Sequence, residues 1–233
     1  MALSKNKTTN EYRYERKFHI SGLSTHEVES IVYRHPSLFS EIYKQRYVNN
    51  IYFDSLGSWH SYLDNLDGSQ RKIKVRIRWY GDLFGFIEQP ELELKIKNGL
   101  LGRKERYSLP SFHFDRESST QVLSLFFGNV SIPGYVKELL KRCSPTLLNR
   151  YKRKYFQSAS RDYRITIDSD LEFYQISSFQ NSFLNNYVDD ISVVLELKYS
   201  KRLDTGSDYI TNFFPFRMTK FSKYVIGIDK ILR

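Results

Sequence analysis

The stretch 72-KIKVRIR-78 carries the pattern that decides the fold. Read with a period of two, Lys72, Lys74, Arg76 and Arg78 share one face, and three aliphatic residues share the other. This alternation predicts a β-strand with an apolar back and a cationic front. Side chains two apart on a strand lie about 6.5–7 Å from each other, so four like charges repel unless an anion covers them. For one strand alone, a solvated outer sheet face is an alternative interpretation.

The same alternation recurs along the chain. Strands are predicted for residues 12–20, 46–54, 91–97, 103–109, 147–156, 163–169, 171–176 and 193–199. Their charged faces carry Arg13/Glu15/Lys17, Glu91/Glu93/Lys95/Lys97, Tyr151/Arg153, Arg164/Asp168 and Glu196/Lys198. Each charged face has an apolar opposite face that must pack against something. Helices are predicted for residues 24–33, 116–127, 133–143, 207–214 and 220–232.

These elements predict an α+β fold. In one arrangement, an antiparallel sheet closes into a barrel, helices pack on the outside, and the charged faces line a wet interior. A flat sheet with one helical layer would place the same charges in bulk water, and the alternation does not separate the two. The polar residues 1–10 are predicted to be disordered, and residues 11–233 to form a single domain.

Composition narrows the classes of partner. The 233 residues include 36 Lys plus Arg against 26 Asp plus Glu, a formal net charge of +10. This excess favours polyanions, namely nucleic acid, phosphorylated metabolites, polyphosphate or an anionic membrane surface. The single cysteine, Cys143, excludes an intrachain disulfide. The N-terminal stretch lacks the apolar segment of a signal peptide, and no apolar run is long enough to span a bilayer, which predicts a cytoplasmic protein.

Seven short motifs occur in an order that resembles the VTC domain, the polyphosphate polymerase branch of the CYTH-like triphosphate tunnel enzymes. They are Arg13-Tyr-Glu15-Arg-Lys17, Arg76-x-Arg78, Glu91-x-Glu93-x-Lys95, Tyr151-x-Arg153, Arg164-Ile-Thr-Ile-Asp168, Glu196-x-Lys198 and Lys220-Phe-Ser222-Lys223. The resemblance extends from about Tyr12 to about Tyr224. One departure is Arg13, which stands where triphosphatases of the wider superfamily place a Glu, and this favours the polymerase branch.

The resemblance implies a β-tunnel that transfers the terminal phosphate of ATP to a growing polyphosphate chain, with Mn²⁺ or Mg²⁺ as cofactor. The implied catalytic residues are Arg76, Arg78, Arg153, Arg164, Lys198 and Lys223. The implied phosphate-binding residues are Lys17, Lys74, Lys95, Lys104, Tyr151, Lys220 and Ser222. Glu196 would hold the metal, with Glu15 or Glu93 as a further ligand. Arginine binds phosphate bidentately, so the four arginines suit the reacting phosphate best.

Alternatives stay open at this stage. The same fold supports a tripolyphosphate or nucleoside triphosphate hydrolase, and a non-catalytic polyanion-binding module is a third hypothesis. Glu91 could instead pair with Lys72 or Lys74, and the register of Lys104 after its turn is uncertain by one residue. Nucleic acid is disfavoured because Tyr and Phe are predicted mostly on the apolar faces, away from the charges. A membrane-protein partner could recruit the domain to a membrane.

Overall fold

The computed structural model describes residues 13–55, 71–98, 101–118, 130–176, 183 and 185–232. The strands are β1 (Arg13–Ile20), β2 (Ser40–Ser55), β3 (Arg71–Tyr80), β4 (Gly85–Ile87), β5 (Glu91–Asn98), β6 (Leu101–Ser108), β7 (Phe112–Phe114), β8 (Cys143–Gln157), β9 (Arg164–Gln175), β10 (Asn186–Asp189) and β11 (Val193–Ser200). The helices are α1 (Thr25–Tyr33), α4 (Gly134–Lys141), the 3₁₀ helix η1 (Lys201–Gly206), α5 (Ser207–Thr211) and α6 (Lys223–Leu232).

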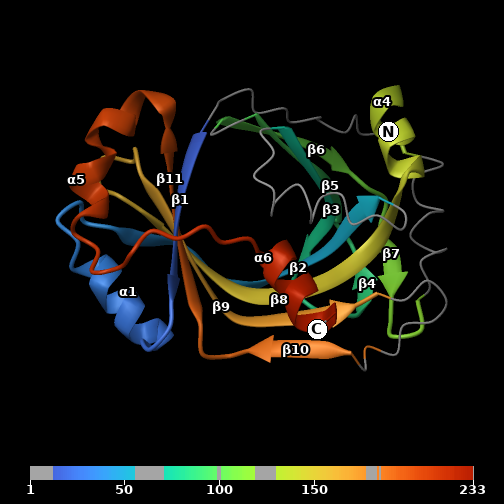
Figure 1. Cartoon of the computed structure of the whole chain (residues 1–233), viewed down its shortest axis with the longest axis horizontal. Helices are drawn as coiled ribbons and strands as arrows, with labels where there is room; N and C mark the ends of the chain where they lie inside the picture. Colours follow the sequence, from blue (N-terminus) through green and yellow to red (C-terminus); the bar gives the residue numbers. More distant parts are fainter. Residues whose placement is uncertain are drawn as a thin grey trace.

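A single antiparallel sheet dominates the fold. Its strands follow the order β1-β11-β9-β8-β2-β3-β5-β6, with β10 paired to β9, while β4 and β7 form a separate two-stranded sheet. The large sheet curls into a half-barrel, so that β1 and β6 end on the same side (Figure 1). Within the described residues, these two end strands share no backbone ladder. Instead, the Lys95 ammonium on β5 donates to the Glu15 carboxylate on β1 over 2.5 Å. The structure therefore shows a curled antiparallel half-barrel rather than the closed barrel.

The alternation of β3 sorts its side chains between the two faces of this sheet. Val75 and Ile77 are buried in an apolar core on the convex side. On the concave side, Arg76 lies opposite Glu93, and Lys74 lies opposite Lys95. The register between β5 and β6 then places Lys104 opposite Lys95, on the same concave face. The uncertainty about Lys104 is thereby resolved.

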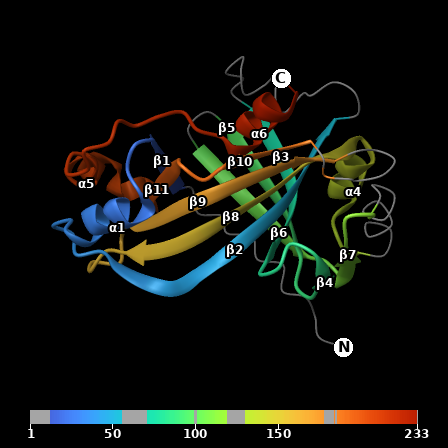
Figure 2. The ribbon, with the colours of Figure 1, turned by 90° about the horizontal axis from the view of Figure 1, so that it is seen from below.

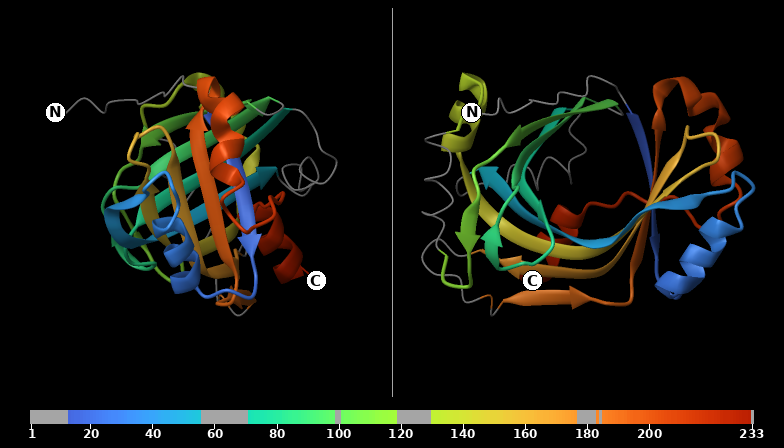
Figure 3. Two further views of the ribbon diagram at one scale, coloured as in Figure 1. Left: turned by 90° about the vertical axis from the view of Figure 1, so that its left-hand side faces the viewer. Right: turned by 180° about the vertical axis from the view of Figure 1, so that it is seen from behind.

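Three of the helices in the described residues cover the convex side. The α1 helix begins with a capping box, in which Ser24 and Glu27 exchange hydrogen bonds, and it buries Val28 against Phe18 and other strand residues. The α5 helix joins the same core, whereas α4 packs on the core under β3 and β5. Figure 2 and the left-hand view of Figure 3 show these helices outside the sheet. For them, the predicted position on the outside is confirmed.

The α6 helix lies on the opposite, concave side. Tyr224 and Ile228 pack against Tyr52 and Leu147, whose side chains share the face of the charged residues. Gly227 makes this approach possible, since a Cβ there would lie 2.5 Å from Phe173 and 2.6 Å from Leu147. The right-hand view of Figure 3 shows α6 within the curl of the sheet. The prediction that the helices lie outside is therefore wrong for α6.

Several element boundaries differ from the predictions. The two strands predicted around Asp170 form the single strand β9, and Asp170 has a positive φ of 51° within it. The helix predicted to end at residue 143 ends at Lys141, and β8 begins at Cys143. Most of the helix predicted for 116–127 lies outside the described residues, as does the segment 1–10. The short strands β4, β7 and β10 were not predicted, because three or four residues are too few to show alternation.

Candidate functional site

One carboxylate on the concave face gathers four cations. Glu93 on β5 is 1% exposed, and Arg76 contacts its Oε2 through Nε at 2.7 Å and through a terminal nitrogen at 2.6 Å. Lys104 binds the other oxygen, Oε1, and Arg106 approaches the same oxygen at 3.4 Å. Arg78 lies 3.7 Å from Oε2. These five residues are called the Glu93 cluster, which holds four cations and one carboxylate.

Arg78 is held in place on several sides. Its Nε donates to Asn50 Oδ1 at 2.8 Å, and a terminal nitrogen donates to the Tyr151 hydroxyl at 3.1 Å. The amide of Asn50 is fixed in turn, because its Nδ2 donates to Asn149 Oδ1 at 2.8 Å. Both asparagines are fully buried. The buried Asn149 Nδ2 has no hydrogen-bond partner among the described residues.

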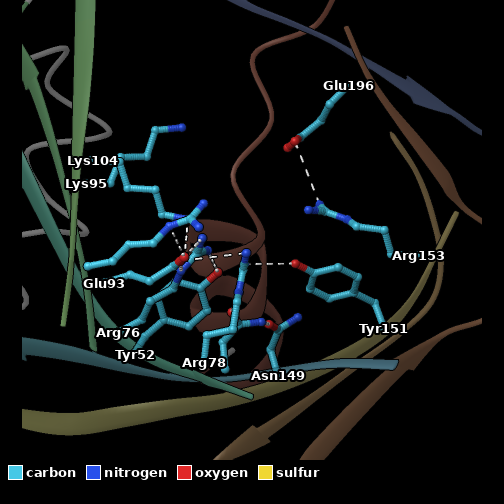
Figure 4. Close-up of polar contacts among 12 residues, drawn as sticks. Tyr52, Arg76, Arg78, Glu93, Lys95, Lys104, Asn149, Tyr151, Arg153 and Glu196 are labelled. Atoms are coloured by element: carbon cyan, nitrogen blue, oxygen red, sulfur yellow. Dashed lines mark hydrogen bonds and ion pairs between the residues drawn. The ribbon is translucent and has the colours of Figure 1, made fainter. Parts of the chain in front are cut away.

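A second group of charges lies on the opposing strands. Asp168 on β9 is fully buried and accepts from Arg153 at 2.6 Å and from Lys223 at 2.5 Å. Glu196 on β11 contacts Lys198 at 2.8 Å, Lys17 at 3.2 Å and Arg153 at 3.8 Å. These six residues are called the Glu196 cluster. Figure 4 shows Glu196, Arg153 and Tyr151 on one side and Glu93, Arg76 and Lys104 on the other, with the Tyr151 hydroxyl directed at Arg78.

The segment before α6 connects the edge strand to the concave face. The Thr219 backbone N–H donates to the Lys17 carbonyl at 2.8 Å, and the His19 N–H donates to the Thr219 hydroxyl at 3.0 Å. This segment thus lies along β1. Two residues later, the Phe221 carbonyl accepts from the Lys17 ammonium at 3.0 Å. Ser222 then accepts from Lys74 at 2.8 Å, which places the start of α6 beside β3.

Electrostatics keep the acids ionised despite burial. Burial alone would raise the pKa of Glu93, but Arg78, Arg76 and Lys104 outweigh it and hold that pKa well below its usual range. The pKa of Glu196 is likewise well below its usual range, because Lys198 and Lys17 outweigh the effect of burial. Burial also lowers the pKa of Lys95 to about 8, with Lys17 adding to the effect and Glu15 opposing it. The face therefore holds ionised carboxylates and a lysine that titrates near neutral pH.

The structure brings most of the predicted site residues together. The Glu93 and Glu196 clusters contain Lys17, Arg76, Arg78, Glu93, Lys104, Arg153, Glu196, Lys198 and Lys223. Lys74, Lys95, Tyr151, Ser222 and Glu15 also lie on this face through the contacts above. Arg164 and Lys220, in contrast, are exposed. Among the described residues, no side-chain hydrogen bond or ion pair joins either of them to the two clusters, although Arg164 on β9 lies directly opposite Lys198 on β11.

Some members of the site escaped prediction. Asn50 and Asn149 carry no charge, and an asparagine within a strand gives no signal of a role in the site. Arg106 could have been found, since it shares a strand face with Lys104. Tyrosines also line the concave side, for example Tyr151 in contact with Arg78 and Tyr52 in contact with Arg76. Most of the buried aromatic residues in the described part of the chain nevertheless belong to the two apolar cores on the convex side, in agreement with the expectation that aromatics lie mostly away from the charges.

One comparison with a solved structure indicates a shared fold. A search of curated proteins gives no match. Among solved structures, the protein PH1819 of Pyrococcus horikoshii OT3 is 13% identical, with a TM-score of 0.47 over 93% of this chain and 96% of that one. A provisionally assigned adenylate cyclase of Vibrio parahaemolyticus is 8% identical, with a TM-score of 0.51 over 93% of this chain and 98% of that one. At this level of identity, the second likeness indicates a shared fold only.

A family comparison covers nearly the whole chain. The VTC domain matches residues 12–232, a range that includes every strand and helix described above and both charged clusters. The match agrees with the seven ordered motifs in the sequence, most of whose charged residues meet on the concave face. The chain therefore belongs to the VTC domain family.

Proposed function

We propose that this protein is a metal-dependent polyphosphate polymerase that transfers the terminal phosphoryl group of ATP to a growing polyphosphate chain. The observation that carries the proposal is the concave face, on which the cations of two opposed clusters outnumber the carboxylates. A chain of phosphates supplies the missing negative charge along its whole length. Membership in the VTC family supports the same class of substrate.

The chemistry needs positioning and compensation of charge more than it needs a base. A terminal oxygen of the chain, already ionised, attacks the γ-phosphorus of ATP. A new O–P bond forms, the bond from the γ-phosphorus to the β–γ bridging oxygen breaks, and ADP leaves with that electron pair. Arg76, Arg78 and Arg153 offer planar forks for the reacting phosphate. The lysines of the two clusters act as point charges along the rest of the chain.

The acidic residues fit a divalent cation in one place. Glu15 on β1 and Glu196 on β11 are close neighbours, since Glu15 lies opposite Lys198 and Lys17 lies opposite Glu196. Mg²⁺ is commonly held by one or two carboxylates together with substrate phosphates, and Mn²⁺ accepts the same oxygen ligands. When bound, the ion would neutralise charge on the phosphate oxygens. Within the described residues there is no group of three or more acidic, His or Cys side chains suited to a metal.

Glu93 does not fit a metal ligand. The four other residues of its cluster are all cations, so among the described residues Glu93 has no second carboxylate beside it to share an ion, unlike the neighbouring Glu15 and Glu196. We therefore propose Glu93 as the counter-ion of its cluster rather than as the predicted metal ligand. The predicted roles of Arg164 and Lys220 at the phosphates stay part of the proposal. Both side chains are exposed, and Arg164 on β9 lies directly opposite Lys198 of the Glu196 cluster.

A hydrolase of the same fold is the second candidate. The observation that favours it is α6, which packs on the concave face and reduces the length of face available to a chain. A shorter face suits tripolyphosphate or a nucleoside triphosphate better than a long polymer. Recruitment by a membrane protein rests on the family resemblance alone. In the described part of the chain, no helix has the length and apolar character to cross a membrane.

The test is direct. The protein is incubated with ATP and Mn²⁺, and the products are resolved on a polyacrylamide gel stained for polyphosphate. Long polyphosphate is expected, and it should disappear with Arg76→Ala but persist with Arg202→Ala, which removes an exposed cation from η1. Free phosphate as the only product would replace the polymerase with the hydrolase. Tight, salt-sensitive binding without any product would leave a polyanion-binding module.

A further inference from the structure

Cations and tyrosines alternate along one wall of the concave face. The Lys223 ammonium lies 4.6 Å from the centre of the Tyr151 ring, and the Arg153 guanidinium carbon lies 5.1 Å from that same ring. Arg153 is also 6.0 Å from the ring of Tyr155. The series continues beyond the two clusters, because Arg46 lies 5.0 Å from the Tyr155 ring and 4.0 Å from the Tyr80 ring.

Strand register places the outer part of this series on the same face as the phosphate site. Arg46 on β2 lies directly opposite Arg153 on β8. Tyr80 is two residues beyond Arg78 on β3, so the two side chains share a face. This outer part therefore follows directly on the arginines that would hold the reacting phosphate. The α6 helix lies over the inner part of the face, where Lys223 faces Tyr151 and Tyr224 packs against Tyr52.

The outer residues differ from the inner ones in exposure and in chemistry. Tyr80 is 42% exposed and Tyr43 is 58% exposed, whereas Tyr151 is only 1% exposed. The Arg46 Nε donates to the Tyr155 hydroxyl at 3.2 Å, and the Tyr43 and Tyr155 rings meet edge to face with centroids 5.7 Å apart. The result is a set of oriented planar groups, of which the Tyr43 and Tyr80 side chains are exposed. Such groups bind nucleobases by stacking, whereas a phosphate gains little from them.

We propose that Arg46, Tyr43 and Tyr80 form a stacking platform for the nucleobase of a nucleoside triphosphate whose phosphates lie over Arg153 and Arg78. This inference rests on the proposed function, since it assumes that a triphosphate binds between the two clusters. It gives the protein a means to distinguish a nucleotide donor from the polyphosphate product. Both ligands present phosphates to the same cations, but only the donor carries a base for the platform.

The experiment compares ATP with inorganic tripolyphosphate by isothermal titration calorimetry, in the presence of Mn²⁺ throughout. Two platform variants are used: Tyr80→Leu removes a ring, and Arg46→Lys keeps the charge but removes the planar surface. Tyr209→Leu serves as control, because Tyr209 is a 62% exposed tyrosine on α5, on the convex side. We expect each platform variant to bind ATP about tenfold more weakly, and tripolyphosphate within about twofold of wild type. The control should bind both ligands normally.

Other outcomes overturn the inference and separate it from the proposed function. If the platform variants weaken ATP and tripolyphosphate equally, the residues act through charge or folding rather than through the base. If the platform variants bind ATP and tripolyphosphate as tightly as the wild type does, the phosphate site is supported and the stacking platform is refuted. A wild-type protein that binds neither ligand would refute the phosphate site and the platform together.

Discussion

Replacing Glu93 with Gln tests how the concave face remains folded without a ligand. This buried carboxylate is the shared partner of Arg76, Lys104 and the other cations of its cluster. Gln keeps the shape and can still accept a hydrogen bond, but it removes the only negative charge that the described residues place in this cluster. The variant should therefore be less stable when empty. It should also bind a polyanion more tightly, because the carboxylate no longer competes for the cations.

The expected loss of stability in the E93Q variant follows from the burial of Glu93, and the expected fall in transition temperature follows from the size of the domain. Removing one partner of a buried ion pair costs about 3–5 kcal/mol. For a domain of about 150–250 residues, each kcal/mol corresponds to about 2–4 °C, so the transition should fall by about 6–20 °C. Tripolyphosphate at about 100 times its dissociation constant adds about 2.7 kcal/mol to the wild type. If the variant binds about tenfold more tightly, the same concentration adds about 4.1 kcal/mol.

Thermal unfolding followed by circular dichroism, with and without tripolyphosphate, measures both effects. Glu138→Gln is the matched control, because Glu138 forms an exposed 2.7 Å pair with Lys141 on α4, and such pairs contribute about 0–1 kcal/mol. An E93Q protein as stable as wild type would show that the cations of the cluster need no counter-ion. A ligand-induced shift no larger than that of wild type would show that Glu93 does not compete with phosphate.

The remaining predictions concern Asn50, Lys95, Asp168 and Gly227. Asn50→Leu removes the acceptor of Arg78 Nε and should slow polyphosphate synthesis about tenfold, while the circular dichroism spectrum stays unchanged. An unchanged rate of synthesis would mean that Asn50 does not orient the arginine. The pKa of Lys95 is lowered to about 8, so its charge is lost as pH rises through that value. The affinity of the wild-type protein for tripolyphosphate, measured by calorimetry, should therefore fall from about pH 7 to pH 9. The affinity of Lys95→Arg should not fall over this range. The pKa of Asp168 is lowered in the folded protein, because Arg153 and Lys223 outweigh the effect of burial. The Asp168 carboxylate therefore stabilises the fold above its unfolded-state pKa of about 3.9, and this stabilisation is lost as pH falls through the folded-state pKa. Urea midpoints that stay constant below about pH 4 would contradict this. Gly227→Ala forces a methyl group against Phe173 and Leu147 and should destabilise the fold by about 1–3 kcal/mol in urea unfolding, or not at all if α6 is loosely attached.

The alternation of apolar and charged residues correctly predicted which side chains lie on each face of the sheet. A shift by one residue would move the apolar side chains out of the core, so burial of one face fixes the register. Val75 and Ile77 lie in the core, and Arg76 and Arg78 lie on the concave side, as the period of two requires. Pairing between strands was harder to predict. Nothing local in the sequence says that Arg76 meets Glu93 or that Asp168 lies behind Arg153, since these contacts depend on strand order.

Two other features were beyond local patterns for different physical reasons. An amphipathic helix shows which of its own sides is apolar, but not which face of a distant sheet it covers, so the position of α6 could not be read from its sequence. Arg164 has the predicted alternation, yet it stands at the first residue of β9, where the side chain reaches solvent. Alternation gives the direction of a side chain and not its depth.

The paired acids explain how a face of like charges can both fold and function. Without Glu93, Asp168 and Glu196, the repulsion among the arginines and lysines would oppose the folded state in the absence of ligand. With as many acids as cations, the face would have no net attraction for phosphate. The arrangement lies between these limits, because each cluster holds more cations than carboxylates. When a phosphate chain binds, the cations exchange carboxylate contacts for phosphate contacts, so breaking the existing ion pairs offsets much of the favourable binding energy. This moderates affinity, and a protein that must release a long charged product needs moderate affinity at each phosphate.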